Sequence, residues 1–338
     1  MKKIMYLMIL LLLIAIGAYL YLPSYLSVTT NEEAVEITIP QGASVNAVSE
    51  LLYEEGVIKS KLWFKYRSQV EGIDRNIRPG TYVIAPDLTL EEIFDLLQKG
   101  NQEVPIVVTI PEGFTLYQIA NRMEAAGIGT AEDFLEATRQ YFQDKGYDFD
   151  TSKLFFEMEG YLYPDTYHFS DKQSMMEIVT TLAATMERVF TEEYMAKAEE
   201  MDLSLHEVLT IASLIEREAY HDNERATIAG VIYNRLTRGM LLQIDATVIY
   251  GIGEGKEHIT RVLYSHLEDP SPFNTYKVEG LPPGPIAAPS RASVEAALYP
   301  EQHSYLYYVL GENGHVFSKT YSEHLTNVAK YREMMNQN

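Results

Sequence analysis

The chain contains no cysteine, and this absence excludes both disulfide bonds and thiol catalysis. Its stability must therefore come from the packed core alone. Positive charge is also scarce, because 27 Lys and Arg residues stand against 48 Asp and Glu residues and leave a net charge of −21. A surface of this sign cannot neutralise phosphates, so we exclude nucleic acid as a partner and expect no attraction to anionic lipid headgroups.

The motifs of several common enzyme classes are absent as well. His206-Glu207 begins like a zinc-protease motif, but Thr210 stands where the second histidine ligand would be. The chain has neither the Gly-x-Ser-x-Gly turn of a serine hydrolase nor a phosphate-binding Walker loop. Its eight histidines are scattered, which is typical of surface and packing residues. We therefore expect no metal and no cofactor.

A long apolar run is present at the N-terminus. It covers residues 4–22, about nineteen residues that as a helix would span roughly 28 Å, close to the hydrocarbon thickness of a bilayer. Lys2 and Lys3 precede it, which predicts a cytoplasmic tail at 1–3, a single-pass anchor in the cell (plasma or inner) membrane and an extracytoplasmic remainder. A cleaved signal peptide is the alternative, but the run is long for one and lacks a small-x-small cleavage site.

A repeated pattern indicates how the next part of the chain is organised. Thr38-Ile39-Pro40-Gln41-Gly42 recurs as Thr109-Ile110-Pro111-Glu112-Gly113, and each copy continues into an amphipathic segment. A weaker third copy starts at Thr89, whose Thr-x-x-Glu pattern predicts a capped helix. Each of these units is typical of a short strand, a turn and a helix. The sequence therefore predicts an α+β protein, with a small α+β module at 34–107 and a larger α+β domain at 108–338.

One predicted helix combines an apolar surface with two carboxylates at its end. Ser204 and Glu207 form a capping box at its start, and apolar residues then recur with helical spacing as far as Ala219. Counting about 100° per residue places Glu216 near this apolar stripe and Glu218 at its margin, where the wall of a cleft would lie. A carboxyl group surrounded by hydrocarbon has a raised pKa and can donate a proton near neutral pH. An ordinary core helix that ends in solvated charges fits the same periodicity.

Further along the chain, polar residues alternate with Gly, Pro and aromatic residues. Gln243 and Asp245 share one side of a segment that we expect to be extended, where they either line a sugar site or cap the next helix. Residues 269–290 are too rich in proline for a helix or a central strand, and they predict a rigid, structured loop. Asn313-Gly314 predicts a hairpin and residues 323–335 a final helix, and we interpret both as scaffold.

Several segments of the chain together carry a family resemblance. They are residues 159–167, Glu216-Arg217-Glu218, residues 242–251, Phe273-Asn274-Thr275-Tyr276 and residues 280–286. In this order, over nearly the whole chain, they resemble the YceG-like (MltG) family of endolytic peptidoglycan transglycosylases. Within this resemblance, residues 34–107 correspond to a LysM-like module and residues 108–338 to the catalytic domain.

The resemblance implies that Glu218, the second glutamate of the Glu-x-Glu pair, is catalytic. Such an enzyme cleaves the β-1,4 bond between N-acetylmuramic acid and N-acetylglucosamine without water and leaves a 1,6-anhydromuramoyl end. One carboxyl group serves both steps, first as acid and then as base. The residues that we expect to bind the substrate are Glu216, Gln243, Asp245, Asn274 and Tyr276.

The resemblance also implies a setting, in which nascent peptidoglycan strands are the substrate and their cleavage terminates elongation. Peptidoglycan synthases (penicillin-binding proteins) would be neighbours at the membrane. Two alternatives stay open: a hydrolytic muramidase, in which Asp245 would supply the second carboxylate, and a non-catalytic, membrane-anchored scaffold that binds peptidoglycan. For Glu216 the sequence leaves two roles, a negative charge that keeps Glu218 protonated or an ion-pair partner of a nearby arginine.

Overall fold

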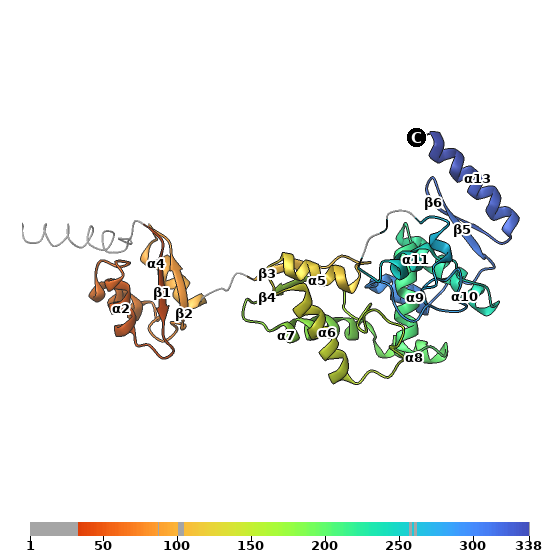
Figure 1. Cartoon of the computed structure of the whole chain (residues 1–338). Coiled ribbons are helices and arrows are strands. Elements are labelled where there is room, and N and C mark those ends of the chain that lie inside the picture. The colour runs from red at the N-terminus through yellow and green to blue at the C-terminus, as the bar shows by residue number, and fades with distance from the viewer. Residues whose placement is uncertain (1–32, 87, 101–104, 257–258, 260–261, 338) are drawn as a thin grey trace, which may run out of the picture. The chain divides into compact units, whose positions relative to one another are not determined.

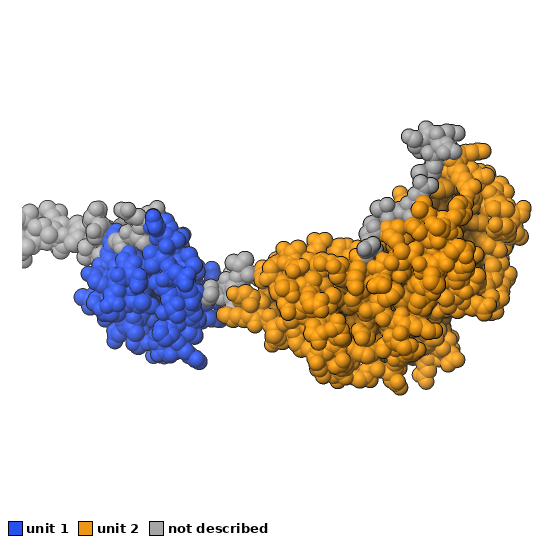
Figure 2. Space-filling model, in the orientation of Figure 1, with its two compact units in different colours: residues 1–104 blue, residues 105–338 orange. Residues whose placement is uncertain are grey.

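The computed structural model describes residues 33–86, 88–100, 105–256, 259 and 262–337. The chain is a mixed α+β protein, as expected, and forms two compact units, residues 1–104 and 105–338 (Figure 2). Among the described residues, no helix is both long enough and apolar enough to cross a membrane. The predicted anchor at 4–22 lies outside the described residues.

The described elements follow one another along the chain as Figure 1 shows. Unit 1 contains β1 (Val35–Ile39), α2 (Val45–Glu54), α3 (Lys61–Val70), β2 (Gly80–Ile84) and α4 (Leu90–Lys99). Unit 2 contains β3 (Ile106–Thr109), α5 (Leu116–Ala125), α6 (Ala131–Lys145), β4 (Thr166–Phe169), α7 (Met175–Val189), α8 (Glu192–Glu200), α9 (Leu205–Glu218), η1 (Asp222–Glu224), α10 (Arg225–Thr237), α11 (Asp245–Ile252), η2 (His266–Glu268), α12 (Arg291–Leu298), β5 (Tyr307–Gly311), β6 (Gly314–Ser318) and α13 (Tyr321–Gln337).

Unit 1 is built around one two-stranded antiparallel sheet. β1 pairs with β2, and α2, α3 and α4 bury their apolar faces in the same core. The rings of Phe64 and Phe94, with centroids 5.2 Å apart, lie in that core. The predicted capping box at Thr89 is confirmed, because its hydroxyl accepts from the backbone N–H of Glu92 while the Glu92 carboxylate accepts from the backbone N–H of Thr89.

Unit 2 begins with a second copy of the same arrangement. β3, α5, α6, β4 and α7 follow in the order of β1, α2, α3, β2 and α4, and β3 pairs with β4 antiparallel (Figure 1). The register repeats as well: Thr38 lies opposite Thr81 with their hydroxyls 3.0 Å apart, and Thr109 lies opposite Thr166 with their hydroxyls 2.9 Å apart. The repeated sequence pattern therefore corresponds to a repeated strand-helix-helix-strand unit.

Helix α9 lies between two hydrophobic cores of unit 2. Leu209 packs in the core of the repeated unit, and the other apolar residues of the buried stretch pack with α10, α11 and α12. Every residue of 208–215 is buried, so the helix is enclosed on all sides and not only along the stripe that its periodicity predicts. The two polar side chains of this buried stretch donate within the helix, Thr210 to the carbonyl of His206 and Ser213 to the carbonyl of Thr210.

Glu159 is a fully buried carboxyl group that joins α5 to α11. Its Oε1 accepts from the backbone N–H of Leu116 at 2.9 Å, and its Oε2 accepts from the Tyr250 hydroxyl at 3.1 Å. Burial raises the pKa of Glu159 to about 8, and these hydrogen bonds, with one from the backbone of Gly160, only partly oppose the rise. Glu159 therefore carries its proton at neutral pH.

The raised pKa of Glu159 predicts a pH-dependent stability. Its contribution is fully present below pH 4.5, the usual pKa of the carboxyl group, and is lost as the pH rises through about 8. Glu159→Gln keeps the size of the side chain and removes the titration. We expect the free energy of unfolding, measured with denaturant, to fall by a few kcal/mol more in the wild type than in Glu159→Gln across this range. Glu124→Gln, on the exposed side of α5, is the matched control and should follow the wild type.

Candidate active site

Glu218 lines a pocket of about 690 Å³ in unit 2. It is the last residue of α9, so the buried length of that helix places its carboxyl group at one fixed position in the wall. The other walls come from α10, α11 and the segments on either side of it, the hairpin of β5 and β6, and one face of α13. The aromatic residues of this pocket are Tyr264, Tyr276, Tyr307, Tyr308 and Tyr321.

The environment of Glu218 favours the protonated carboxyl group. Burial raises the pKa of Glu218 to about 7, and the negative charge of Asp245 acts in the same direction. A hydrogen bond from Tyr308 and the positive charge of Arg217 lower it in part. The negative end of the α9 dipole also disfavours a carboxylate at this position. Glu218 can therefore both give up and take back a proton near neutral pH.

Tyr308 donates its hydroxyl proton to Glu218 Oε2 at 2.8 Å. Because Oε2 already accepts this bond, it favours the proton of the neutral carboxyl group on Oε1. The same hydrogen bond stabilises the carboxylate that remains once the proton has left. Tyr308 thus fixes the orientation of Glu218 and limits how far burial raises its pKa.

The structure brings Gln243, Asp245 and Tyr276 to the pocket of Glu218. The Tyr276 hydroxyl donates to Asp245 Oδ1 at 2.7 Å. The expected extended segment is wrong, however, because Gln243 has a φ of +53° and Asp245 is the first residue of α11. An aspartate at this place is favoured by the helix dipole, so the chain turns into a helix sooner than the pattern predicts.

Arg235 is a buried cation in the wall of the pocket. Its guanidinium donates to the carbonyls of Leu306 at 2.6 Å and Leu242 at 2.8 Å, and to Gln243 Oε1 at 3.3 Å. It also lies over the ring of Tyr307, 5.0 Å from its centroid. Arg235 therefore joins α10 to the segment before α11 and to β5, and keeps a positive charge in the wall of the pocket.

Glu216 does not lie in the pocket. Its Oε2 accepts from the backbone N–H and hydroxyl of Ser290, at 2.9 and 2.5 Å, and from the Ser293 hydroxyl at 2.8 Å. It also forms a buried ion pair with Arg225 at 3.1 Å. Of the two roles that the sequence leaves open, the geometry supports the arginine partner, and Asp245 is the charge that raises the pKa of Glu218. Glu216 fastens α9 to the start of α12.

Asn274 is fully buried and is also separated from the pocket. Its amide donates to the carbonyls of Leu267 and Asp269 at 3.0 and 2.7 Å, and its Oδ1 accepts from the backbone N–H of Tyr276 at 3.0 Å. All of its polar atoms are therefore used inside the loop. Asn274 positions Tyr276 and has no group left for a substrate contact.

The C-terminal elements contribute more than the expected scaffold. The predicted hairpin forms, with Glu312 and Asn313 as its turn residues, but β5 supplies Tyr308 and β6 supplies His315 to the pocket. Helix α13 adds Tyr321, His324 and two further residues spaced along one face. A local pattern predicts that a hairpin exists and does not reveal which distant helix its side chains meet, so the sequence offers no signal for Tyr308.

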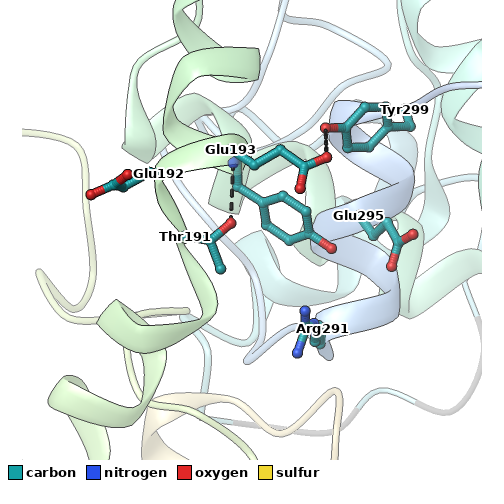
Figure 3. A pocket seen from close by; sticks show the side chains of 7 residues that line it. Thr191, Glu192, Glu193, Arg291, Glu295 and Tyr299 are labelled. Carbon is teal, nitrogen blue, oxygen red and sulfur yellow. Dashed lines mark hydrogen bonds between the residues drawn. The ribbon is translucent and has the colours of Figure 1, made fainter.

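A second hollow of about 670 Å³ lies between α8 and α12 (Figure 3). Glu193 accepts a hydrogen bond there from the Tyr299 hydroxyl at 3.1 Å, and Arg291 and Glu295 face the same space (Figure 3). It holds none of the predicted site residues. In the ranges that the structure describes, no group of three or more His, Asp or Glu side chains is placed to hold a metal ion.

Comparison with known proteins decides the family. The model of the YceG-like family matches residues 37–330, which is most of the chain. The chain belongs to the YceG-like family. A relative from Bacillus subtilis (strain 168), named endolytic murein transglycosylase, is 36% identical over 95% of this chain and 92% of its own length.

Two further relatives agree with this assignment. A protein of the same name from Streptococcus pneumoniae serotype 2 is 29% identical over 97% of this chain, which spans 64% of that longer protein. A crystal structure of a YceG-like protein from Listeria monocytogenes is 34% identical, with a TM-score of 0.60 over 88% of this chain and 99% of that one. The family resemblance that the sequence segments indicated is confirmed.

The hydrogen bond between Tyr308 and Glu218 can be tested without a substrate. Tyr308→Phe removes the donor and keeps the ring, so we expect the pKa of Glu218 to rise by about one unit above its value near 7. The measurement is a ¹³C NMR titration of the Glu218 carboxyl carbon. Tyr307→Phe, which keeps the Tyr308 hydroxyl, should leave the Glu218 titration where it is in the wild type; a shift there and none in Tyr308→Phe would contradict the assignment.

Proposed function

We propose that this YceG-like protein is a lytic transglycosylase that cleaves peptidoglycan glycan strands, with Glu218 as its single acid and base. The observation that carries the proposal is the carboxyl group of Glu218, which lies in an open pocket with a pKa of about 7 and accepts one oriented hydrogen bond. The names of its relatives support the same activity.

The proposed reaction needs one carboxyl group and no water. Protonated Glu218 donates its proton to the glycosidic oxygen between N-acetylmuramic acid and N-acetylglucosamine, and the bond from C1 to that oxygen breaks. The carboxylate of Glu218 then takes the proton of the muramic C6 hydroxyl while that oxygen bonds to C1. The acid is regenerated, and the new end is a 1,6-anhydromuramoyl residue.

The aromatic walls suit the apolar faces of sugar rings. Tyr264 is 82% exposed and Tyr321 is 59% exposed, and both line the pocket of Glu218. Gln243 and Asp245, whose side chains are exposed in the same pocket, are placed to bind hydroxyl or acetamido groups. We assign substrate contact to these two residues and to Tyr276, and a positioning role to Glu216 and Asn274.

The proposal also includes the membrane anchor, the domain organisation and the cellular setting that the sequence predicts. Residues 4–22 anchor the protein in the cell membrane, residues 34–107 are the LysM-like module, and residues 108–338 are the extracytoplasmic catalytic domain. A tethered active site reaches only strands close to the bilayer, which supports cleavage of nascent strands beside the peptidoglycan synthases and termination of their elongation.

The hydrolytic alternative rests on Asp245. A muramidase needs a second carboxylate near the acid, and the charge of Asp245 is close enough to raise the pKa of Glu218. The Tyr276 hydroxyl, however, donates to Asp245 Oδ1, which suits a fixed binding group better than a free nucleophile or base. The mass of the cleaved ends separates the two reactions, because hydrolysis adds one water.

The decisive experiment compares the full-length protein with Glu218→Gln on uncrosslinked glycan strands. We expect the wild type to release anhydromuramoyl ends, and Glu218→Gln to lose about 10²- to 10⁴-fold in rate because it cannot transfer the proton. Strand binding should persist in Glu218→Gln. Exposed Glu254→Gln is a control for the loss of one charge. Reducing ends one water heavier would favour a muramidase, and no cleavage by either protein would favour a scaffold.

The pKa of Glu218 also predicts the pH dependence of the reaction. The reaction begins only when Glu218 carries its proton, so kcat/KM should fall as the pH rises through about 7. Tyr308→Phe should move this decline to higher pH, because it removes a hydrogen bond that favours the carboxylate. A kcat/KM that stays constant from pH 6 to 9 would argue against Glu218 as the acid.

A further inference from the structure

Glu224, in the 3₁₀ turn that follows α9, is a buried carboxylate that gathers four hydrogen-bond donors. Its Oε1 accepts from the backbone N–H of His315 at 2.7 Å, and its Oε2 accepts from His315 Nδ1 at 2.9 Å. Oε2 also accepts from the backbone N–H groups of Tyr220 and His221, at 3.3 and 3.4 Å. The reaction proposed above makes no use of this carboxylate.

These donors come from two segments: one follows Glu218 in the sequence, and the other is the hairpin that carries Tyr308. Tyr220 and His221 follow Glu218 almost directly in the chain. His315 belongs to β6 and lies opposite Leu310 of β5, two residues from Tyr308. One carboxylate therefore ties the end of α9 to the hairpin whose hydroxyl binds Glu218.

Gly314, the first residue of β6, allows this close approach. Its φ is +109°, and a Cβ atom built on it would collide with Glu224 Oε1. Beside it, the ring of His315 packs edge-on against the ring of Tyr308, with centroids 5.3 Å apart, and lines the pocket. The backbone at Gly314 and the side chain of His315 thus both keep the hairpin in contact with Glu224.

We propose that Glu224 is a positioning residue of the active site, which sets the distance between the Tyr308 hydroxyl and the Glu218 carboxyl group by holding the hairpin on the end of α9. Glu224 acts through Tyr308 and touches no reacting group. Its effect on turnover rests on the proposed function, whereas its effect on the proton of Glu218 does not.

Glu224 is held in its charged form, which strengthens its hydrogen bonds to the hairpin. Burial alone would raise its pKa, but the hydrogen bonds from His315 and His221 outweigh burial and hold the pKa below its usual value. Tyr308, Asp245 and Arg217 act directly on the pKa of Glu218. The other titratable and charged groups of its pocket are Arg235 on α10, Tyr264, Tyr276, Tyr307 on β5, His315 on β6, and Tyr321, His324 and Arg332 on α13. A substitution of Glu224 replaces none of them. The loss of its own negative charge would lower the pKa of Glu218, so a rise in that pKa can come only from a change in the positions of these groups.

The test is a thermodynamic cycle on the titration of Glu218. The carboxyl carbon is followed by ¹³C NMR in the full chain labelled with glutamate, and its resonance is identified by its loss in Glu218→Gln. Glu224→Gln removes the charge at constant size, and we expect it to raise the pKa of Glu218 by up to the shift of about one unit that Tyr308→Phe causes. In a Tyr308→Phe background the same change should add no further shift. Equal shifts in both backgrounds, or no shift in the wild-type background, overturn the proposal.

Two further variants keep the test decisive. Asp222→Asn removes the same charge two residues away, where the side chain is 92% exposed, and should leave the titration of Glu218 unchanged. Gly314→Ala disturbs the same contact from the other side and should reproduce the shift; it replaces Glu224→Gln in the cycle if that protein does not fold. A rise of the Glu218 pKa in Asp222→Asn equal to that in Glu224→Gln would mean that the effect does not depend on the contact with the hairpin, and would overturn the proposal.

Kinetics then link the shift to turnover. Glu224→Gln should lower kcat, leave KM within about twofold, and move the alkaline decline of kcat/KM in the same direction as Tyr308→Phe. A loss of folded protein alone would lower the rate and leave the pH profile in place. The NMR titration needs no substrate, so its failure would overturn the role of Glu224 alone, whereas absence of anhydromuramoyl ends would overturn the proposed function alone.

Discussion

Everything in the site depends on the desolvation of one carboxyl group at the end of a buried helix. Residues 208–215 of α9 are enclosed by two hydrophobic cores, so the helix cannot move without loss of packing in both. Glu218 lies three residues after this enclosed stretch and is held where burial disfavours its charge. The stability of the fold and the protonation of the candidate acid therefore have the same physical origin.

The balance at Glu218 is set by segments that are far apart in the chain. Burial and Asp245 favour the proton, while Tyr308, 90 residues after Glu218, favours the carboxylate. Glu216 and Glu224, on either side of Glu218 in sequence, turn away from the pocket and fasten α9 to α12 and to the C-terminal hairpin. Of three neighbouring glutamates, one faces the pocket and two hold the elements around it.

The second copy of the repeated strand-helix-helix-strand unit contacts the segments around the end of α9. In the second copy, the turn between β3 and α5 contacts the part of unit 2 that holds Glu218: Gly113 donates to the carbonyl of Ala288 at 2.9 Å and accepts from Arg217 at 3.1 Å. Thr115, the cap of α5, donates to the carbonyl of Gly255 at 2.7 Å. The second copy is thus part of the scaffold that supports the end of α9.

The sequence by itself determined the α+β class, the repeated unit, the capping boxes, the hairpin at Asn313-Gly314 and Glu218 as the candidate acid, because each depends on residues close together in the chain or on one family segment. Only the tertiary structure decided which polar residues reach the pocket. Asn274 and Glu216 have polar groups that could contact a substrate, but these groups form hydrogen bonds with other residues of the protein. Tyr308, Arg235 and Glu224 are positioned by contacts with residues far away in the sequence. The periodicity of a helix or strand does not reveal such contacts.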